Sequence, residues 1–230
     1  MYLSRLRLEP YRVRKALSSP QVMHGSIEEA FEGKSVPSSK RRKLWRLDKV
    51  NGQLYLLVCS HMLPRSVCPD NLGGELVTWE TIEYEPFLSR LRMGQRWYFR
   101  LKANPVYSIS QGAGKPGKKY GHVTVDQQKS WLLSRTDSHG FSILPCESTF
   151  ESKSHKSDSY QFDVVERAHL RFKKSGNAKP VELSVATFEG VLEVCDAVAL
   201  RQALCNGVGR GKAYGCGLLT LASAFGRRQD

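Results

Sequence analysis

The segment 207–219 (GVGRGKAYGCGLL) contains residues that are suited to holding an anion. Five of its first eleven residues are glycine, and a packed element would avoid so many because glycine loses the most conformational entropy on folding. Glycines allow positive φ and let a ligand approach backbone N–H groups, while Arg210 and Lys212 add positive charge that can hold phosphates. The segment is not a P-loop, because GxxxxGKS and GxxxxGKT are absent. It is not a dinucleotide-binding fingerprint either, because it lies between a predicted helix and the last predicted strand; taken alone, it is also compatible with a plain connecting loop.

Histidine is the second candidate for chemistry, because its unperturbed pKa of about 6.5 allows proton transfer near neutral pH. His24 is the best placed, since it follows the apolar Met23 early in a predicted helix, within a basic part of the chain. On its own, a single histidine on a helix is more commonly a surface or packed residue. The six histidines of the chain are His24, His61, His122, His139, His155 and His169.

The predicted helix that carries His24 has clear start signals. Residues 18–20 (Ser-Ser-Pro) offer capping hydroxyls followed by a proline that suits the first turn. The spacing of Met23, Ile27 and Phe31 then places apolar side chains on one face. Strands are predicted on both sides of this helix, from alternating residues and from the hairpin signal Asn51-Gly52. These strands cover residues 2–8, 44–47, 54–60 and 96–103.

The predicted order of elements is strand, helix, strand, strand, an irregular region with room for a short helix, and strand. This is the ferredoxin-like β-α-β-β-α-β order, and the second half of the chain is compatible with the same plan. We therefore expect an α+β fold of two tandem ferredoxin-like, RRM-like domains, covering residues 1–108 and 109–230. In the second half a Gly/Lys-rich loop is predicted at 112–121, and helices and strands at 126–135, 141–144, 169–172, 181–194, 197–204 and 218–222.

The charge of the chain predicts an anionic partner. The sequence has 35 Lys and Arg against 22 Asp and Glu, a net charge of +13, and its pI is near 9.6. The excess lies mainly in residues 1–48 and 101–175, which either converge on one groove or form two solvated faces. Nucleic acid is the first candidate partner and an acidic membrane surface the second. The membrane is the weaker candidate, because we find no basic amphipathic helix with a large apolar face.

The remaining composition bears on location and cofactors. No stretch approaches the ~18 apolar residues that would span a bilayer, and residues 1–8 alternate and are charged, unlike a signal peptide. We therefore expect a cytoplasmic protein with no membrane role. The six cysteines contain no CxxC pair, so neither disulfides nor a zinc site is expected. The sequence also shows no cluster of Asp, Glu and His, and we expect no metal or other cofactor.

The glycine-rich segment as a whole resembles the C-terminal loop of the RAMP proteins of CRISPR systems, in particular the CasE family of the type I-E Cascade complex. Three further segments resemble the same family: residues 1–4 (MYLS), 96–105 (RWYFRLKANP) and 188–192 (FEGVL). The resemblance extends from residue 1 to about residue 222. It implies two tandem ferredoxin-like domains that recognise a CRISPR repeat hairpin in precursor crRNA, cut it once, and retain the crRNA together with the other Cascade subunits.

The resemblance also implies a chemistry. Metal-independent cleavage uses the 2′-OH of the RNA as the nucleophile and leaves a 2′,3′-cyclic phosphate and a 5′-OH. In CasE-type proteins a histidine within the pattern PxxxHxxxxxxF is catalytic, and Pro20, His24 and Phe31 match that pattern. Some members have a tyrosine three residues before this histidine, where this chain has Gln21. The second acid–base group therefore stays open, and Gln21 is expected at most to orient a phosphate. A catalytically silent RAMP-type crRNA-binding subunit is the alternative.

Basic residues and the glycine-rich loop are expected to bind the RNA. Lys173 and Lys174 form a predicted hairpin tip, and the matching region of the family contacts RNA near the cleavage site. Arg100 and Lys102 alternate on one strand face and could lie along a duplex, which proteins recognise mainly by its shape and phosphates. The expected RNA-binding residues are Arg12, Arg14, Lys15, Gln21, Arg100, Lys102, Lys173, Lys174, Gly207, Gly209, Arg210, Gly211, Lys212, Gly215 and Gly217.

Overall fold

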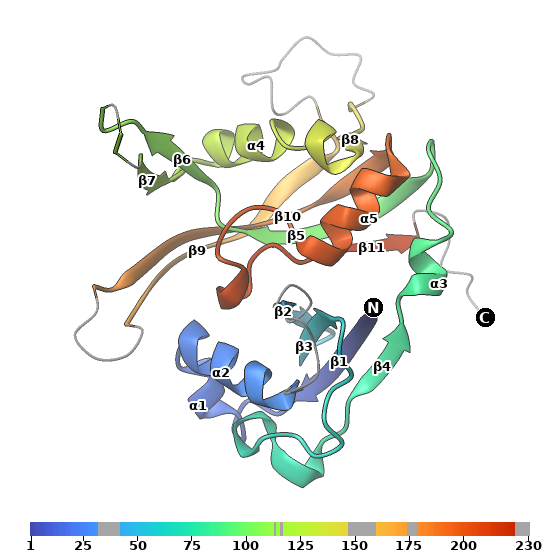
Figure 1. Ribbon diagram of the computed structural model, residues 1–230, viewed down its shortest axis with the longest axis vertical. Helices are drawn as coiled ribbons and strands as arrows, with labels where there is room; N and C mark the ends of the chain where they lie inside the picture. The colour runs from blue at the N-terminus through green and yellow to red at the C-terminus, as the bar shows by residue number, and fades with distance from the viewer. Residues whose placement is uncertain (32–41, 113, 116, 147–159, 174–178, 224–230) are drawn as a thin grey trace.

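In the computed structural model, the first part of the chain forms a four-stranded antiparallel sheet with two helices packed on it (Figure 1). Its elements are β1 (Tyr2–Leu8), α1 (Arg14–Leu17), α2 (Pro20–Ala30), β2 (Lys43–Val50), β3 (Gln53–Ser60) and β4 (Glu80–Glu83). The strand order is β2-β3-β1-β4, and β1 pairs with β3 along its whole length. The structure describes residues 1–31, 42–112, 114–115, 117–146, 160–173 and 179–223.

Local sequence explains why α2 forms where it does. Ser19 is extended, and its side chain accepts a hydrogen bond from the backbone N–H of Gln21 at 3.2 Å, which satisfies one of the free donors of the first turn. Pro20 occupies the first helical position. Met23 and Ile27 lie on the face that is buried against the sheet. The helix and its start signals are therefore confirmed, and His24 is carried next to the buried face.

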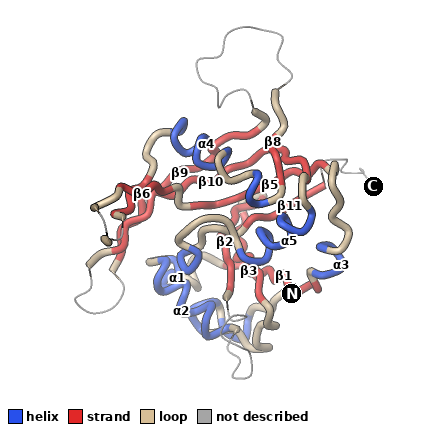
Figure 2. The backbone as a smooth tube through the Cα atoms, turned by 45° about the horizontal axis from the view of Figure 1, so that its top comes forward, coloured by secondary structure: helices blue, strands red, loops and turns tan. Residues whose placement is uncertain are grey.

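A second antiparallel sheet follows, built mainly from the rest of the chain. Its elements are β5 (Arg96–Ala103), α4 (Val125–Leu133), β8 (Phe141–Ile143), β9 (Phe162–Phe172), β10 (Val181–Val194), α5 (Ala197–Asn206) and β11 (Leu219–Ser223). The strand order is β11-β5-β10-β8, and β9 pairs with β10 to form a long arm that reaches beyond the sheet (Figures 1 and 2). Side chains of α4 and α5 share one buried cluster with the sheet. When β9 and the two short strands between β5 and α4 are left aside, β5, α4, β8, β10, α5 and β11 follow the ferredoxin-like order, as expected.

The division of the chain between the two sheets differs from the expected one. The strand at residues 96–103 was assigned to the first domain, but β5 pairs with β10 and β11 of the second sheet. The short β4 supplies the fourth strand of the first sheet instead. The irregular region after β3 contains the expected short helix, α3 (Glu85–Leu88), which follows β4. Two 3-10 helices, η2 (Asp70–Leu72) and η3 (Gly74–Leu76), lie between β3 and β4. We therefore propose a domain boundary between Glu83 and Arg96 rather than after residue 108.

One segment predicted as a loop is partly a strand. Within residues 112–121, Lys118–Gly121 forms β7, which pairs with β6 (Val106–Ile109) in a separate two-stranded hairpin. This hairpin extends beside α4, at the opposite side of the second sheet from α3 (Glu85–Leu88) (Figure 1). Lysine is common on exposed strand edges, where it discourages pairing with other chains, so a Lys-rich composition alone does not exclude a strand.

The following statements on membrane helices, metal ligands and disulfides apply to the described residues alone. No helix in it is long and apolar enough to cross a membrane. No group of three His, Cys, Asp or Glu side chains in it is placed to hold a metal ion. All six cysteines are free thiols.

Arg46 on β2 joins the two sheets. Its side chain is fully buried and forms a two-armed ion pair with Asp48, with both N···O distances at 2.7 Å. The remaining donors bind the carbonyl oxygens of Arg100 and Leu218, each at 2.9 Å, and the hydroxyl of Thr220 at 2.8 Å. All three acceptors belong to the second sheet or to the segment leading into it, so this side chain connects the two domains.

Candidate active site

His24 lies near the start of α2 and faces the glycine-rich loop. Its side chain is 29% exposed, and its ring meets the ring of Tyr214 edge-on, with centroids 6.4 Å apart. Tyr214 belongs to η6 (Lys212–Tyr214), a short turn within the glycine-rich loop, and also packs edge-on against Phe172 at the end of β9, at 4.8 Å. Three segments that are distant in sequence therefore meet at His24, and Figure 1 shows the loop descending from α5 to a place above α2.

The surroundings of His24 favour its neutral imidazole. Burial lowers the pKa of His24 below its usual 6.5, Glu28 opposes this effect, and Lys43 adds to it. The Nδ1 atom lies 3.8 Å from Oε1 of Glu28, and the ammonium of the buried Lys43 donates to the other oxygen of Glu28 at 2.5 Å. Because the neutral form prevails above the lowered pKa, His24 can accept a proton at pH 7.

Tyr214 is held in place by the packing of the glycine-rich loop on β2. All five glycines of the motif have φ between +76° and +93°. At Gly215 the backbone passes so close to Trp45 that an added Cβ would lie 2.8 Å from the indole ring. The indole N–H of Trp45 donates to the carbonyl of Ala213 at 3.2 Å. The turn that carries Tyr214 is therefore fixed on both sides by one tryptophan.

The substitution Gly215→Ala tests this arrangement. We expect it to lower the free energy of unfolding by about 1–3 kcal/mol, because alanine at φ +78° is strained and its Cβ collides with Trp45. The change is read from urea unfolding. The matched control is Gly25→Ala, at a helical position with no atom within 4 Å of the added Cβ, which should be neutral or stabilising. Equal stability of the two variants would contradict the packing role of Gly215.

A cleft of about 390 Å³ is lined by Met23 and Tyr214, the two neighbours of His24, although His24 itself is not among the lining residues. The first domain contributes residues 16–20, which connect α1 to α2, together with Met23. The second domain contributes the end of β9, Lys102 and Tyr214. Met23 precedes His24 in the sequence, and the ring of Tyr214 lies beside the ring of His24. Because Met23 and Tyr214 both line this cleft, His24 lies at its edge, between the two domains.

The wall formed by β9 carries a row of cationic or ionisable side chains. Arg167, His169, Arg171 and Lys173 are exposed at every second position, and such residues lie on one face of a strand. His169 and Arg171 line the cleft itself. Arg171 is also paired with Glu182 on the neighbouring strand at 3.3 Å, in an exposed contact. The arm thus presents a basic stripe that leads into the cleft.

The structure brings most of the expected basic residues to this region. Arg12, Arg14 and Lys15 are exposed just ahead of α2, and Lys102 lines the cleft. Lys173 is exposed at the end of β9. Gln21 lies partly buried in the first turn of α2, and Lys174 lies outside the described residues. Their roles toward RNA stay predictions.

Arg100 has a different environment from the one expected. Its guanidinium pairs with Asp48 across the domain interface at 3.2 Å and with Glu189 on the neighbouring strand. Two carboxylates therefore already compensate its charge, and its side chain is only 32% exposed. The alternation that placed Arg100 beside Lys102 on one strand face is confirmed, but of these two residues only Lys102 lines the cleft.

The glycine-rich loop divides into packed and accessible residues. Gly207 and Gly217 are buried, and an added Cβ at Gly207 would lie 2.7 Å from Leu44. Gly215 is buried as well, although it lines the cleft. The expectation that these three glycines contact RNA stays a prediction. Arg210 is exposed, and Gly209, Gly211 and Lys212 are partly buried. Burial lowers the pKa of Lys212.

Sequence reasoning missed several residues that surround the site. Glu28 is one helical turn after His24, and an (i, i+4) spacing could have indicated their contact. The alternation from Arg167 to Lys173 could have indicated the basic stripe of β9. No local signal indicates that Tyr214 meets His24, since the two are 190 residues apart in the chain and only the docking of the two domains brings them together.

Two ferredoxin-like domains with a glycine-rich loop docked on α2 define a protein of the RAMP class. The family described as CRISPR associated protein matches residues 1–223. The chain belongs to this family and is of the CasE type.

Three known proteins illustrate the relationship. The chain is 30% identical over 226 residues to the CRISPR-associated endoribonuclease Cse3 of Thermus thermophilus, covering 96% of this chain and all of that protein. It is 28% identical over 197 residues to the CRISPR system Cascade subunit CasE of Escherichia coli, covering 81% and 84%. A solved structure of CRISPR endoribonuclease Cse3 bound to a 19-nucleotide RNA superposes with a TM-score of 0.76, at 30% identity and 96% and 100% coverage.

Proposed function

We propose that this chain is a metal-independent endoribonuclease that cleaves CRISPR repeat hairpins in precursor crRNA and then stays bound to the mature crRNA within Cascade. The observation that carries the proposal is the contact of His24 with Tyr214, which sets a neutral histidine at the edge of a basic cleft. Its relatives support it, since one is named an endoribonuclease and another a Cascade subunit. A cytoplasmic location is part of the proposal, because the substrate is an RNA transcript.

In the proposed reaction His24 accepts the proton of the substrate 2′-OH, and the 2′-oxygen attacks the adjacent phosphorus. The bond from phosphorus to the 5′-oxygen breaks, and that oxygen takes a proton from water or from the protonated His24. The products are a 2′,3′-cyclic phosphate and a 5′-OH. Since Nδ1 of His24 faces Glu28, we assign Nε2 to the substrate. Lys102 and Arg171 in the cleft stabilise the charge that develops on the phosphate oxygens, and Gln21 has at most an orienting role.

The β9–β10 arm is proposed to bind the hairpin stem. Two members of its row of exposed basic side chains, His169 and Arg171, line the cleft together with Tyr214, so a stem held along β9 would direct one strand towards His24. Proteins bind such stems through phosphates and shape rather than through the narrow major groove. Arg12, Arg14 and Lys15 add positive charge from the first domain on the approach to α2.

Incubation of the purified protein with its repeat RNA in EDTA tests this function directly. We expect one cut per hairpin, at the same rate with and without EDTA, and co-purification of the hairpin product with the protein. Binding without cleavage would instead support the catalytically silent crRNA-binding subunit. Activity that disappears in EDTA and returns with added Mg²⁺ would indicate a metal nuclease and contradict the proposal.

The pH dependence of cleavage follows from the lowered pKa of His24. A general base acts in its neutral form, so kcat/KM should rise with pH, with the midpoint of the rising limb below the usual pKa of 6.5, because burial lowers the pKa of His24. The variant Glu28→Gln removes the carboxylate that raises this pKa, and its rising limb should therefore lie at lower pH. Two results would contradict the assignment of His24 as base: a rising limb of kcat/KM at the same pH in Glu28→Gln as in the wild type, or a wild-type kcat/KM that falls between pH 5.5 and 7.

The basic stripe predicts a specific salt dependence. Each of Arg171→Ala and Lys173→Ala should weaken hairpin binding and make the slope of log K against log [salt] shallower by about one unit, the contribution of one phosphate contact. The matched control is Lys49→Ala, an exposed lysine outside the cleft, which should leave the slope unchanged. Slopes equal to that of the wild type in both stripe variants would show that the stem binds elsewhere.

A further inference from the structure

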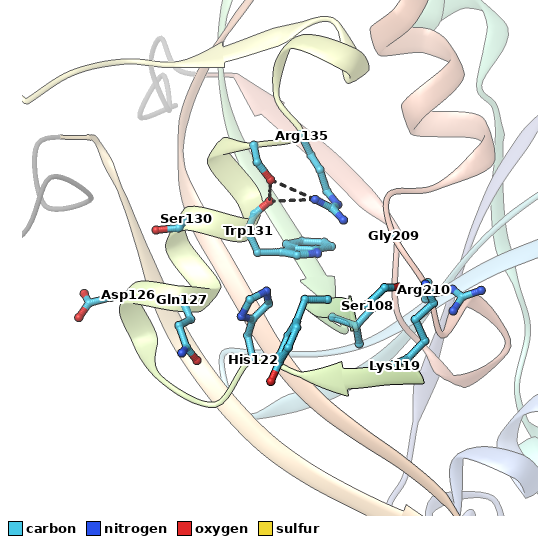
Figure 3. A pocket seen from close by; sticks show the side chains of 13 residues that line it. Ser108, Lys119, His122, Asp126, Gln127, Ser130, Trp131, Arg135, Gly209 and Arg210 are labelled. Carbon is cyan, nitrogen blue, oxygen red and sulfur yellow. Dashed lines mark hydrogen bonds between the residues drawn. The ribbon is translucent and has the colours of Figure 1, made fainter. Parts of the chain in front are cut away.

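A second cavity lies on the other side of the glycine-rich loop (Figure 3). It has a volume of about 650 Å³ and is bounded by α4, by the β6–β7 hairpin, and by Gly209 and Arg210 of the loop. It shares no lining residue with the cleft beside His24. Its volume is in the range of small-molecule and cofactor sites, and it is sufficient for one nucleotide. No residue that lines it takes part in the proposed reaction.

Flat side chains form much of the wall of this cavity. Tyr107 is 43% exposed, and its ring centroid lies 5.0 Å from that of His122. The guanidinium of Arg135 lies 4.4 Å from the centroid of the Trp131 ring, and in Figure 3 His122 and Trp131 lie one above the other beside the hollow. Unpaired bases in RNA stack on aromatic rings and on arginine planes. The exposed part of the Tyr107 ring, which also stacks on Tyr120 at 5.8 Å, and the guanidinium of Arg135 offer two surfaces of this kind.

Two ring nitrogens at the base of the cavity lack hydrogen-bond partners among the described residues. They are Nε1 of Trp131, whose side chain is almost fully buried, and Nδ1 of His122. A buried polar group without a partner is unfavourable and is commonly explained by an unseen ligand or water. A base inserted into the cavity presents carbonyl and ring-nitrogen acceptors and amino donors, which match an indole N–H and a neutral imidazole.

The charges around the cavity suit a phosphate. Lys119, Arg135 and Arg210 line it, against the single carboxylate of Asp126. Arg210 is also close in sequence to Tyr214, which lines the cleft. Four peptide units separate these two residues, so their Cα atoms are at most about 15 Å apart. At a stacked rise of about 3.4 Å per nucleotide, about five nucleotides cover that distance.

We propose that this cavity binds one unpaired nucleotide of the single-stranded RNA that flanks the repeat hairpin. Its base stacks between Tyr107 and Arg135, and its phosphate lies near Lys119 and Arg210. The inference rests on the proposed function, because the flank belongs to the same precursor RNA. The glycine-rich loop then contacts the RNA on both of its sides, with Tyr214 at the cleft and Arg210 at the nucleotide.

The test uses repeat hairpins with flanks on both sides, in which a 2′-deoxy nucleotide at the cleavage position prevents cutting. The fluorescent base 2-aminopurine is placed at one flanking position at a time, over about six nucleotides on each side. We expect a change of fluorescence on binding at one position. An abasic nucleotide at that position should weaken binding of the wild type about tenfold, the size of one base–aromatic stacking contact.

The double variant Tyr107→Ala/Arg135→Gln should abolish both effects and bind the hairpin without flanks as the wild type does. The matched control is Tyr98→Ala/Arg90→Gln, with an exposed tyrosine and arginine outside this cavity, which should retain both effects. No responding position, a response that persists in the double variant, or an equal loss of binding to the flankless hairpin would each overturn the inference. Cleavage of the all-ribose hairpin distinguishes this failure from failure of the proposed function, since only the latter abolishes cutting.

Discussion

Replacement of His24 by alanine is expected to slow single-turnover cleavage of repeat RNA by about 10²- to 10⁴-fold, the usual contribution of a positioned general base. Burial lowers the pKa of this imidazole, which favours its neutral form, and the ring lies beside Tyr214, a residue that lines the cleft. Its side chain is only partly exposed and is not needed to hold the basic stripe in place. Affinity for the hairpin should therefore change by less than about twofold. The cleavage rate is measured at saturating protein and the affinity by titration of the same preparation.

The matched control for this prediction is His61→Ala, a histidine on an exposed loop after β3. This variant should cleave at the wild-type rate. Two results would count against the role of His24: a variant that still cleaves at full rate, and a variant that loses binding and cleavage in equal proportion. The second result would mean that His24 positions the RNA and does not transfer a proton.

The second large effect is expected at the domain interface. Arg46→Met should lower the free energy of unfolding by about 3–5 kcal/mol, because it leaves Asp48 buried without its two-armed partner. It also removes the guanidinium donor from the carbonyls of Arg100 and Leu218, of which Arg100 keeps a hydrogen bond from the Thr220 hydroxyl at 3.4 Å. Arg100 stays 3.2 Å from Asp48 and compensates part of the charge, which favours the lower end of this range. Urea unfolding at pH 7 measures the loss.

Two further variants show whether burial causes this loss. Arg46→Met/Asp48→Leu removes both charges and should recover much of the stability, since an apolar pair of similar volume is often as stable as a buried ion pair. Arg5→Met breaks an exposed pair with Glu80 and should cost less than about 1 kcal/mol. An Arg46→Met protein as stable as the Arg5→Met protein would contradict the role of Arg46 at the interface.

Elements with local signals could be predicted well from the sequence. The hairpin turn Asn51-Gly52 has φ of 49° and 78°, which are the positive values that its residue types favour. Ser19 and Pro20 begin α2 as expected. The strand predicted at 181–194 is β10 with the same bounds. In each case a few adjacent residues determine the backbone conformation.

Sheet membership could not be predicted in the same way. The strand at 96–103 was found, but its alternation contains no information on its partners, which are β10 and β11. The strand β4 (ETIE) is short and polar because it lies at the edge of its sheet, and it was missed. The order of elements alone therefore predicts β5 at the position in the first sheet that β4 occupies. The predicted domain boundary after residue 108 rests on the same assignment.

In the candidate active site, too, contacts between residues distant in sequence could not be predicted. His24 and the glycine-rich loop were singled out by residue type and by resemblance, and the structure brings them together. The compensation of Arg100 by Asp48 and Glu189 was not visible, because both carboxylates are distant in sequence. The packing of Gly207 on Leu44 was hidden for the same reason. Spacing identifies candidate groups, whereas their partners depend on how the two domains dock.

The central claim is that His24 activates the 2′-OH of the RNA without a metal. The most direct measurement compares two repeat hairpins in EDTA, one all-ribose and one with a single 2′-deoxy nucleotide at the cleavage position. We predict that the first is cut to a 2′,3′-cyclic phosphate and a 5′-OH, and that the second binds equally well but stays intact. Cleavage of the deoxy-substituted hairpin at the same position would show that another nucleophile attacks the phosphate, and would contradict the account.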